Sequence, residues 1–74
     1  MNNYLNVKRR MPHETIFLLN SYEDIAIKSI PGKISTFFAK ERGGKEYQIS
    51  NMSYLIWDTV SEAKEMTQQE YNNF

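Results

Sequence analysis

The sequence contains no cysteine, and its longest unbroken apolar run, residues 16–19, is only four residues long. Without cysteine, neither a disulfide framework nor a thiolate zinc site can add stability. Four apolar residues are far short of the roughly 20 that cross a bilayer, which excludes a membrane-spanning helix. Nine basic side chains balance nine acidic ones, which excludes a polybasic tail, a strongly acidic mimic and a charge-driven disordered chain. The chain should therefore fold, with its stability supplied by packing or by a partner.

The length limits the architecture to one small domain, residues 1–74, with no room for separate catalytic and regulatory modules. A chain of this size buries only about 60% of its unfolded surface. Aromatic residues make up 14% of it, which indicates an aromatic contact surface as well as an aromatic core. Lys8, Arg9 and Arg10 resemble the basic start of a signal peptide, but residues 11–15 do not continue as the required apolar stretch. We therefore expect a cytoplasmic location.

The charges are unevenly distributed along the chain. Residues 1–50 carry eight basic and five acidic side chains, a net charge of +3, and residues 51–74 have a net charge of −3. Either the two parts attract each other within the fold, or each meets a different partner. We favour the first interpretation, because exposed charges separated by more than about 8 Å are mostly screened at physiological ionic strength.

The middle of the chain predicts β-strands separated by turns. Residues 15–20, 24–30 and 33–41 are rich in branched and aromatic side chains. Pro31-Gly32 fits a type II turn and Gly43-Gly44 fits a tight hairpin loop. Residues 47–50 then supply a fourth strand. The fold class is therefore α+β, with a three- or four-stranded antiparallel β-meander.

The two turns predict a strand register. Pro31-Gly32 pairs Ile27 with Thr36 and Ile25 with Phe38, and Gly43-Gly44 pairs Phe38 with Ile49 and Lys40 with Tyr47. A two-residue loop also sets Glu41 against Glu46, an unfavourable pair that a longer loop would relieve. The predicted core face carries six side chains: Ile25, Ile27, Ile34, Phe38, Tyr47 and Ile49. The reverse face receives Ala26, Lys28, Ser35, Phe37, Ala39, Gln48 and Ser50.

The first strand is apolar on both sides, so two of its residues 16–19 should join Phe37 in an apolar patch on the reverse face. Such a patch needs a cover. Tyr4, Leu5 and Val7 could fold back over it as a short strand or loop. Another protein or a second copy of the chain is the alternative.

The last third of the chain changes to helical spacing, which predicts a C-terminal helix on the core face. The apolar positions that recur at this spacing are Met52, Leu55, Ile56, Val60 and Ala63. Residues 67–70, Thr-Gln-Gln-Glu, have the spacing of a capping box. We therefore expect a break near residues 64–66 and a short second helix from about Gln68 to Asn72 that displays Tyr71 and Phe74. A strand over residues 54–60 and one continuous helix over 52–73 are the alternatives.

The sequence offers little for catalysis. His13, the one histidine, follows Pro12 in a predicted loop, and no serine has a nucleophile signature. Asp58 and Glu62 are spaced as a solvated acidic face of a helix. Neither metal-ligand spacing nor a phosphate-binding loop is present. We expect a protein that is not an enzyme and that uses no metal or cofactor.

Binding is the favoured function. An aromatic anchor with a basic rim on the reverse face is typical of a protein-binding surface, and Trp57, Tyr54 and Tyr71 form a second candidate. The predicted partner-binding residues are Leu18, Lys28, Phe37, Arg42, Lys45 and Trp57. The alternative is a nucleic-acid-binding β-sheet module, against which the neutral net charge argues. A ligand-holding homo-oligomer is a third interpretation, which no residue singles out.

No named family is identified from the residues. In general style, a compact chain without cysteine, with a Gly-Gly hairpin and the ending Glu-Met-Thr-Gln-Gln-Glu-Tyr, is similar to many small accessory proteins of bacteriophages and mobile elements. This resemblance implies stoichiometric binding that inhibits or redirects a host protein. It agrees with the protein-binding interpretation.

Overall fold

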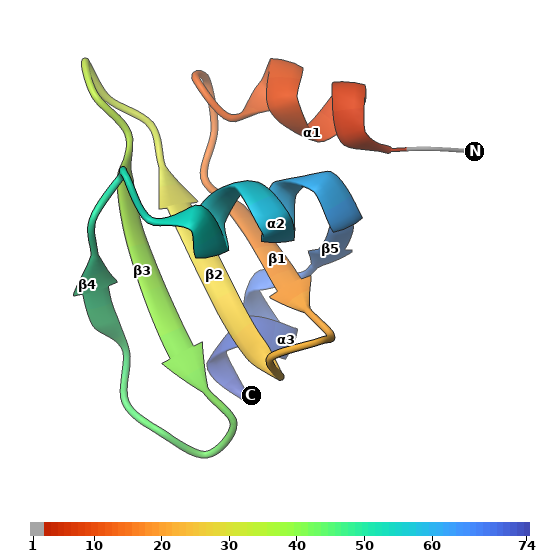
Figure 1. Ribbon diagram of the computed structural model, residues 1–74, viewed down its shortest axis with the longest axis vertical. Coiled ribbons are helices and arrows are strands. Elements are labelled where there is room, and N and C mark those ends of the chain that lie inside the picture. Colours follow the sequence, from red (N-terminus) through yellow and green to blue (C-terminus); the bar gives the residue numbers. More distant parts are fainter. Residues whose placement is uncertain (1–2) are drawn as a thin grey trace.

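The computed structural model describes residues 3–74 and contains one antiparallel sheet with three short helices (Figure 1). The elements follow in the order α1 (Tyr4–Arg10), β1 (Ile16–Asn20), β2 (Ile25–Ile30), β3 (Thr36–Glu41), β4 (Tyr47–Ile49), α2 (Tyr54–Glu62), β5 (Lys64–Met66) and α3 (Gln68–Asn72). The strand order β4-β3-β2-β1-β5 is a four-stranded meander with β5 added beside β1. The predicted α+β class, the meander and the C-terminal helix are confirmed.

The first strand has two apolar sides, as its sequence predicts, and each side enters a different core. Ile16 and Leu18 are buried beneath α1 and α2, whereas Phe17 and Leu19 pack on the opposite face. Because directly paired residues share a face of the sheet, the pairs of Leu18 with Ile27 and of Ile27 with Ala39 carry the first face across three strands. The sheet is therefore a central layer with helices on both sides.

The larger core lies between the sheet and the helices α1 and α2 (Figure 1). Its buried side chains are Val7, Met11, Ile16, Leu18, Ile27, Phe37, Ala39, Ile56, Val60 and Ala63. The N-terminal segment contributes Val7 from helix α1, so the prediction that it covers the reverse face as a strand or loop was wrong. Within residues 3–74, no helix combines the length and apolar character needed to cross a membrane.

The predicted register was wrong for β3, which presents its faces the other way round. Ile25 pairs with Glu41 and Lys28 pairs with Phe38, because residues 31–35 form a longer connection than the predicted Pro31-Gly32 turn. On the other side, Phe37 pairs with Ile49. Relative to the predicted pairing, β3 is shifted by three residues against β2 and by one residue against β4. Both shifts are odd, so each places the side chains of β3 on the opposite face of the sheet. Phe37 is consequently 5% exposed in the larger core, and Phe38 lies on the reverse face.

The β3–β4 connection is a longer loop than two residues, which removes the Glu41 and Glu46 pairing. It spans residues 42–46, and the Gly44 amide donates to the Glu41 carbonyl at 2.8 Å. Gly43 has a φ of 75°, a conformation that glycine adopts without steric cost. The predicted glycine hairpin is present, although its two glycines do not form the whole loop.

Helix α2 begins at the Ser53 cap, whose side chain accepts from the Leu55 amide, and ends at Ala63 in a left-handed conformation. This reversal directs residues 64–66 back along β1, where they pair as the edge strand β5. The expected break at this position is therefore a fifth strand. A strand of this short length gives no recognisable pattern in the sequence.

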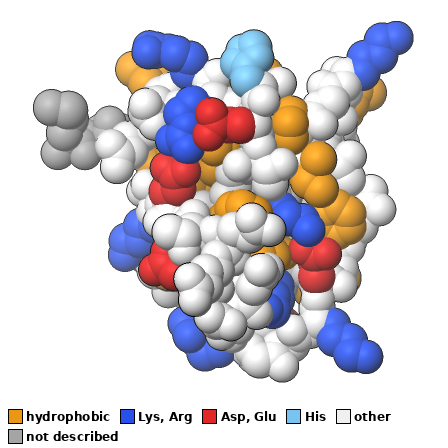
Figure 2. Space-filling model, turned by 180° about the vertical axis from the view of Figure 1, so that it is seen from behind, with side chains coloured by type: hydrophobic (Ala, Val, Ile, Leu, Met, Phe, Trp, Pro, Cys, Tyr) orange, Lys and Arg blue, Asp and Glu red, His pale blue; other side chains and the backbone are white. Residues whose placement is uncertain are grey.

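Helix α3 has the predicted bounds and the predicted capping box between Thr67 and Glu70. It does not display its aromatic residues, because Tyr71 is 3% exposed and Phe74 is buried beside it. The Tyr71 ring lies 5.1 Å from that of Phe17, and both pack with Leu19 on the reverse face. The C-terminal segment thus supplies the cover that we expected from elsewhere. Seen from behind, this face mixes basic with acidic groups and shows hydrophobic side chains between polar ones (Figure 2).

Candidate functional site

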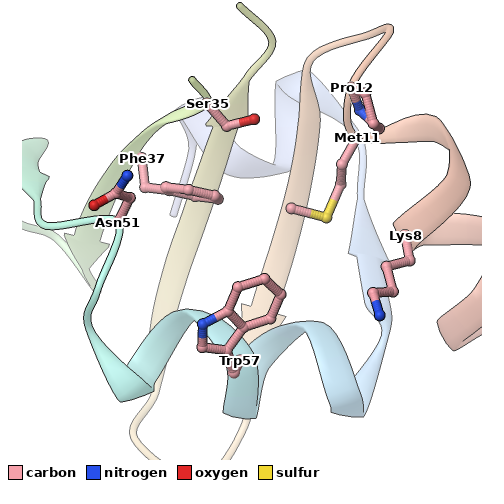
Figure 3. Close-up of a pocket in the computed structure, with 7 residues that line it drawn as sticks. All are labelled: Lys8, Met11, Pro12, Ser35, Phe37, Asn51 and Trp57. Atoms are coloured by element: carbon pink, nitrogen blue, oxygen red, sulfur yellow. The ribbon is translucent and has the colours of Figure 1, made fainter. Parts of the chain in front are cut away.

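A groove opens on the side of the sheet that α1 and α2 cover, where the end of α1, the β2–β3 loop and α2 meet (Figure 3). Its volume is about 320 Å³. Four of the side chains that line it are apolar: Met11, Pro12, Phe37 and Trp57. Such a cavity accommodates an apolar side chain better than a polar one, because it offers a polar group few hydrogen-bond partners.

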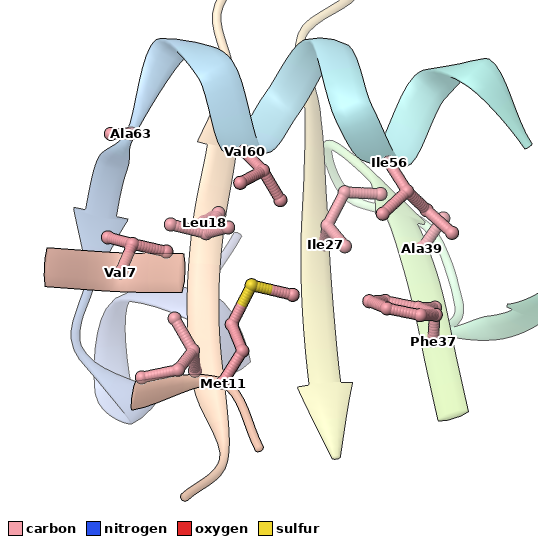
Figure 4. Packing of buried hydrophobic residues seen from close by; sticks show 10 residues of the cluster. Val7, Met11, Leu18, Ile27, Phe37, Ala39, Ile56, Val60 and Ala63 are labelled. Atoms are coloured by element: carbon pink, nitrogen blue, oxygen red, sulfur yellow. The ribbon is translucent and has the colours of Figure 1, made fainter. Parts of the chain in front are cut away.

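The floor of the groove is held in place by the larger core. Phe37 and Met11 are both more than nine-tenths buried, and they pack in the same cluster as Ile27 and Ile56 (Figure 4). A side chain surrounded by core contacts has few alternative rotamers. The floor of the groove is therefore held by the core itself, and a preformed cavity limits the entropy that binding would cost.

Trp57 forms one wall and is the exposed aromatic side chain of the site. On α2, Ile56, Thr59 and Val60 point into the core, which leaves the neighbouring Trp57 half exposed. The Asn20 side chain donates to the Thr59 hydroxyl at 3.0 Å and so ties this helix to β1. Trp57 is thus carried by a helix that is held against the sheet.

Several exposed hydrophobic side chains lie next to the groove in sequence. Ile34 precedes the lining residue Ser35 and is 71% exposed, and Met52 follows the lining residue Asn51 and is 85% exposed. Tyr54 lies one helical turn before Trp57 and is also exposed. Exposed apolar groups that gather around a preformed cavity are typical of an interaction surface.

The polar lining of the groove is cationic or neutral. It consists of Lys8, Ser35 and Asn51, with no acidic side chain among them. The Lys8 ammonium lies 5.3 Å from the centre of the Tyr4 ring on the same helix. The groove is therefore an apolar cavity with one positive charge at its edge.

Of the six predicted partner-binding residues, the structure brings only Phe37 and Trp57 together, at this groove. Leu18 is completely buried in the larger core and is inaccessible. Lys28, Arg42 and Lys45 lie on the reverse face or at the β3–β4 hairpin. Met11, Pro12 and Asn51 were not predicted, because they come from loops with no periodic pattern.

Lys28 and its neighbour Lys40 hold α3 against the sheet. The Lys28 ammonium lies 2.6 Å from a carboxylate oxygen of Glu46, and the Tyr71 hydroxyl donates to the same oxygen at 2.8 Å. The Lys40 ammonium donates to the backbone carbonyls of Tyr71 and Asn72, at the C-terminal end of α3. Lys28 and the Tyr71 hydroxyl together hold the pKa of Glu46 below its usual value. These cations already have partners within the protein.

Arg42 is also paired internally. Its guanidinium makes a two-pronged contact with Asp24, at 2.8 and 3.0 Å, and lies 4.2 Å from the centre of the Phe74 ring. Hydrogen bonding to Arg42 lowers the pKa of Asp24. The second predicted surface likewise loses one member, since Tyr71 is buried whereas Tyr54 and Trp57 are exposed.

A second, polar cleft lies at the β1–β2 turn, beside the later part of α2, and includes Glu23, Asp58 and Glu62. Burial raises the pKa of Glu62, but hydrogen bonds from Ser21 and the nearby Lys64 outweigh that effect and lower it. Glu62 is therefore ionised at neutral pH and anchors the turn. Among residues 3–74, no three His, Cys, Asp or Glu side chains are grouped to hold a metal ion.

Comparisons with protein-family models, with curated proteins and with solved structures find no match to this chain.

Proposed function

We propose that this protein binds another protein stoichiometrically, without catalysis, by receiving an apolar side chain in the groove beside Trp57. The observation that supports this proposal is a preformed apolar cavity of about 320 Å³ with a half-exposed tryptophan as its wall. Tryptophan is one of the residue types most often found among the few that supply most of the binding energy of a protein interface. If the chain is an accessory protein of a bacteriophage or mobile element, as its general style suggests, such binding would inhibit or redirect a host protein.

The alternative, a nucleic-acid-binding sheet, has less support. It would require a basic sheet face open to the nucleic acid. On the reverse face, Lys28 is paired with Glu46, and Lys40 contacts the end of α3. A phosphate would have to displace these internal partners, which lowers its affinity.

The proposal can be tested by introducing a photocrosslinking amino acid at Asn51, which lines the groove and is exposed. A protein that crosslinks from this position in cells would be identified, purified and mixed with the wild-type chain. The chain has one tryptophan, so its fluorescence reports on the groove directly. We expect a 1:1 complex and a blue shift of the Trp57 emission as the indole loses water.

Two variants separate this groove from the rest of the surface. Trp57→Gln, measured by titration calorimetry because it removes the fluorophore, should weaken binding about thirtyfold, the equivalent of roughly 2 kcal/mol. Tyr22→Ser removes a more exposed aromatic side chain at the β1–β2 turn and should leave the affinity unchanged. The proposal fails if no protein crosslinks from Asn51, or if Trp57→Gln folds and binds like the wild type. Steeply salt-dependent binding of an oligonucleotide, with no protein complex, would establish the alternative instead.

A further inference from the structure

Apart from Lys40, which contacts backbone carbonyls, the cations of this protein divide into those that have acidic partners and those that do not. Arg10, Lys28, Arg42 and Lys64 each form an ion pair. Lys8, Arg9, Lys33 and Lys45 have no carboxylate within ion-pair distance among residues 3–74.

Three of the four unpaired cations belong to the segments that border the groove. Lys8 lines it, Arg9 follows on the same helix, and Lys33 lies in the β2–β3 loop two residues before the lining residue Ser35. Figure 1 shows α1 and this loop at the same end of the sheet. Lys45 lies in the β3–β4 hairpin at the opposite end of β3.

The unpaired acids lie elsewhere. Glu23 and Asp58 both line the polar cleft at the β1–β2 turn, Glu41 is at the end of β3 beside the hairpin, and Glu70 is in the capping box of α3. The apolar groove therefore has positive charges near it and none of its own acidic side chains to neutralise them. Exposed charges that remain unpaired around an apolar cavity steer a partner of opposite charge.

On the basis of the proposed function, we infer that the partner's binding segment carries an aromatic or large aliphatic side chain flanked by carboxylates. The apolar side chain enters the cavity between Phe37 and Trp57, and the flanking carboxylates approach Lys8 and Lys33. An acidic protein segment fits better than a nucleic acid, because the cavity is apolar and Lys8 is its one charged lining residue.

The inference can be tested with two synthetic peptides that share a central Phe-Leu pair. One has aspartate and glutamate on both sides of the pair, and the other has lysine and arginine at the same positions. Binding is followed by the fluorescence of Trp57 in the full chain. The acidic peptide should bind at least about tenfold more tightly than the basic peptide at low salt.

Charge-reversal variants locate the effect. Lys8→Glu should weaken binding of the acidic peptide about threefold to tenfold, and Lys33→Glu should act in the same direction. Lys45→Glu changes the net charge identically but lies at the far hairpin, so it should leave the affinity close to that of the wild type.

Each other result has a definite meaning. If both peptides bind equally well and Lys8→Glu has no effect, the inferred acidic partner is wrong while the groove remains a protein-binding site. If Lys8→Glu and Lys45→Glu weaken binding equally, the effect is one of net charge and the inference also fails. If neither peptide changes the Trp57 emission, the inferred acidic segment is wrong, and crosslinking from Asn51 decides separately whether the groove binds a protein. Tighter binding of a single-stranded oligonucleotide at the same site, or a dimer that closes the groove in sedimentation, would replace the acidic partner.

Discussion

The substitution Tyr71→Phe tests how α3 is held on the sheet. It keeps the buried ring against Phe17 and removes only the hydroxyl, which donates to Glu46 at 2.8 Å. A hydrogen bond to a charged group contributes about 1.5–3 kcal/mol. Glu46 retains Lys28 and is about one-third exposed, so the lower value applies. We expect the variant to be about 1.5 kcal/mol less stable at pH 7, a fall in Tm of roughly 6–12 °C for a domain of this size.

The same variant should change the pH dependence. Burial and the negative charge of Glu46 raise the pKa of Tyr71 above its ordinary value of about 10. Above pH 10 the unfolded chain releases this proton while the folded chain keeps it. The wild type therefore loses stability that it has in full below pH 10, by about 1.4 kcal/mol at pH 11. The phenylalanine variant lacks this loss, so the two proteins should become almost equally stable near pH 11.

The measurement is urea unfolding at pH 7 and at pH 9–11, followed by circular dichroism because ionised tyrosines alter the fluorescence. Comparing the two proteins at each pH removes the contributions to stability that they share. Tyr54→Phe is the matched control, since this side chain is exposed and should show no difference at any pH. The reasoning is refuted if Tyr71→Phe equals the wild type at pH 7, or if the gap between them stays constant up to pH 11.

Two further predictions concern stability. Thr67→Ala removes the capping-box acceptor for the Glu70 amide and should lower the free energy of unfolding, measured by urea titration, by about 1 kcal/mol. Thr67→Ser keeps a hydroxyl acceptor and should retain most of the wild-type stability, so equal losses in the two variants would contradict the cap. Ser29 is fully buried, and its hydroxyl has no hydrogen-bond partner within residues 3–74. Ser29→Ala should therefore raise the melting temperature or leave it unchanged, and a clear decrease would reveal a partner for the hydroxyl.

The C-terminal part of the fold was the most predictable from the sequence, because its signals are local. The Thr67 and Glu70 spacing gave the bounds of α3, and the periodicity of residues 55–63 gave α2. The register of β3 was less predictable, because Phe37 and Phe38 are adjacent and either could enter the core. The length of the β2–β3 connection decides between them, and Pro31-Gly32 is compatible with more than one length.

The candidate site was only partly predictable. Trp57 and Phe37 were identified as binding residues, although Phe37 was placed on the reverse face. The cations Lys28 and Arg42 were expected to border a contact surface, but Glu46 and Asp24 neutralise them in the folded protein. The two members of such an ion pair are far apart in the sequence, so a paired cation cannot be distinguished from an unpaired one without the tertiary structure.

Local sequence patterns were enough to predict the elements whose signals lie within one turn or one strand: the doubly apolar β1, the glycine hairpin, α2 and the capped α3. The tertiary structure alone decided which phenylalanine of β3 faces the larger core, that residues 64–66 form a fifth strand, and that α3 covers the reverse face. It also decided where the groove lies, because Met11, Pro12 and Trp57 come from segments far apart in the chain. Local patterns determine secondary structure, whereas a binding cavity depends on how distant segments pack.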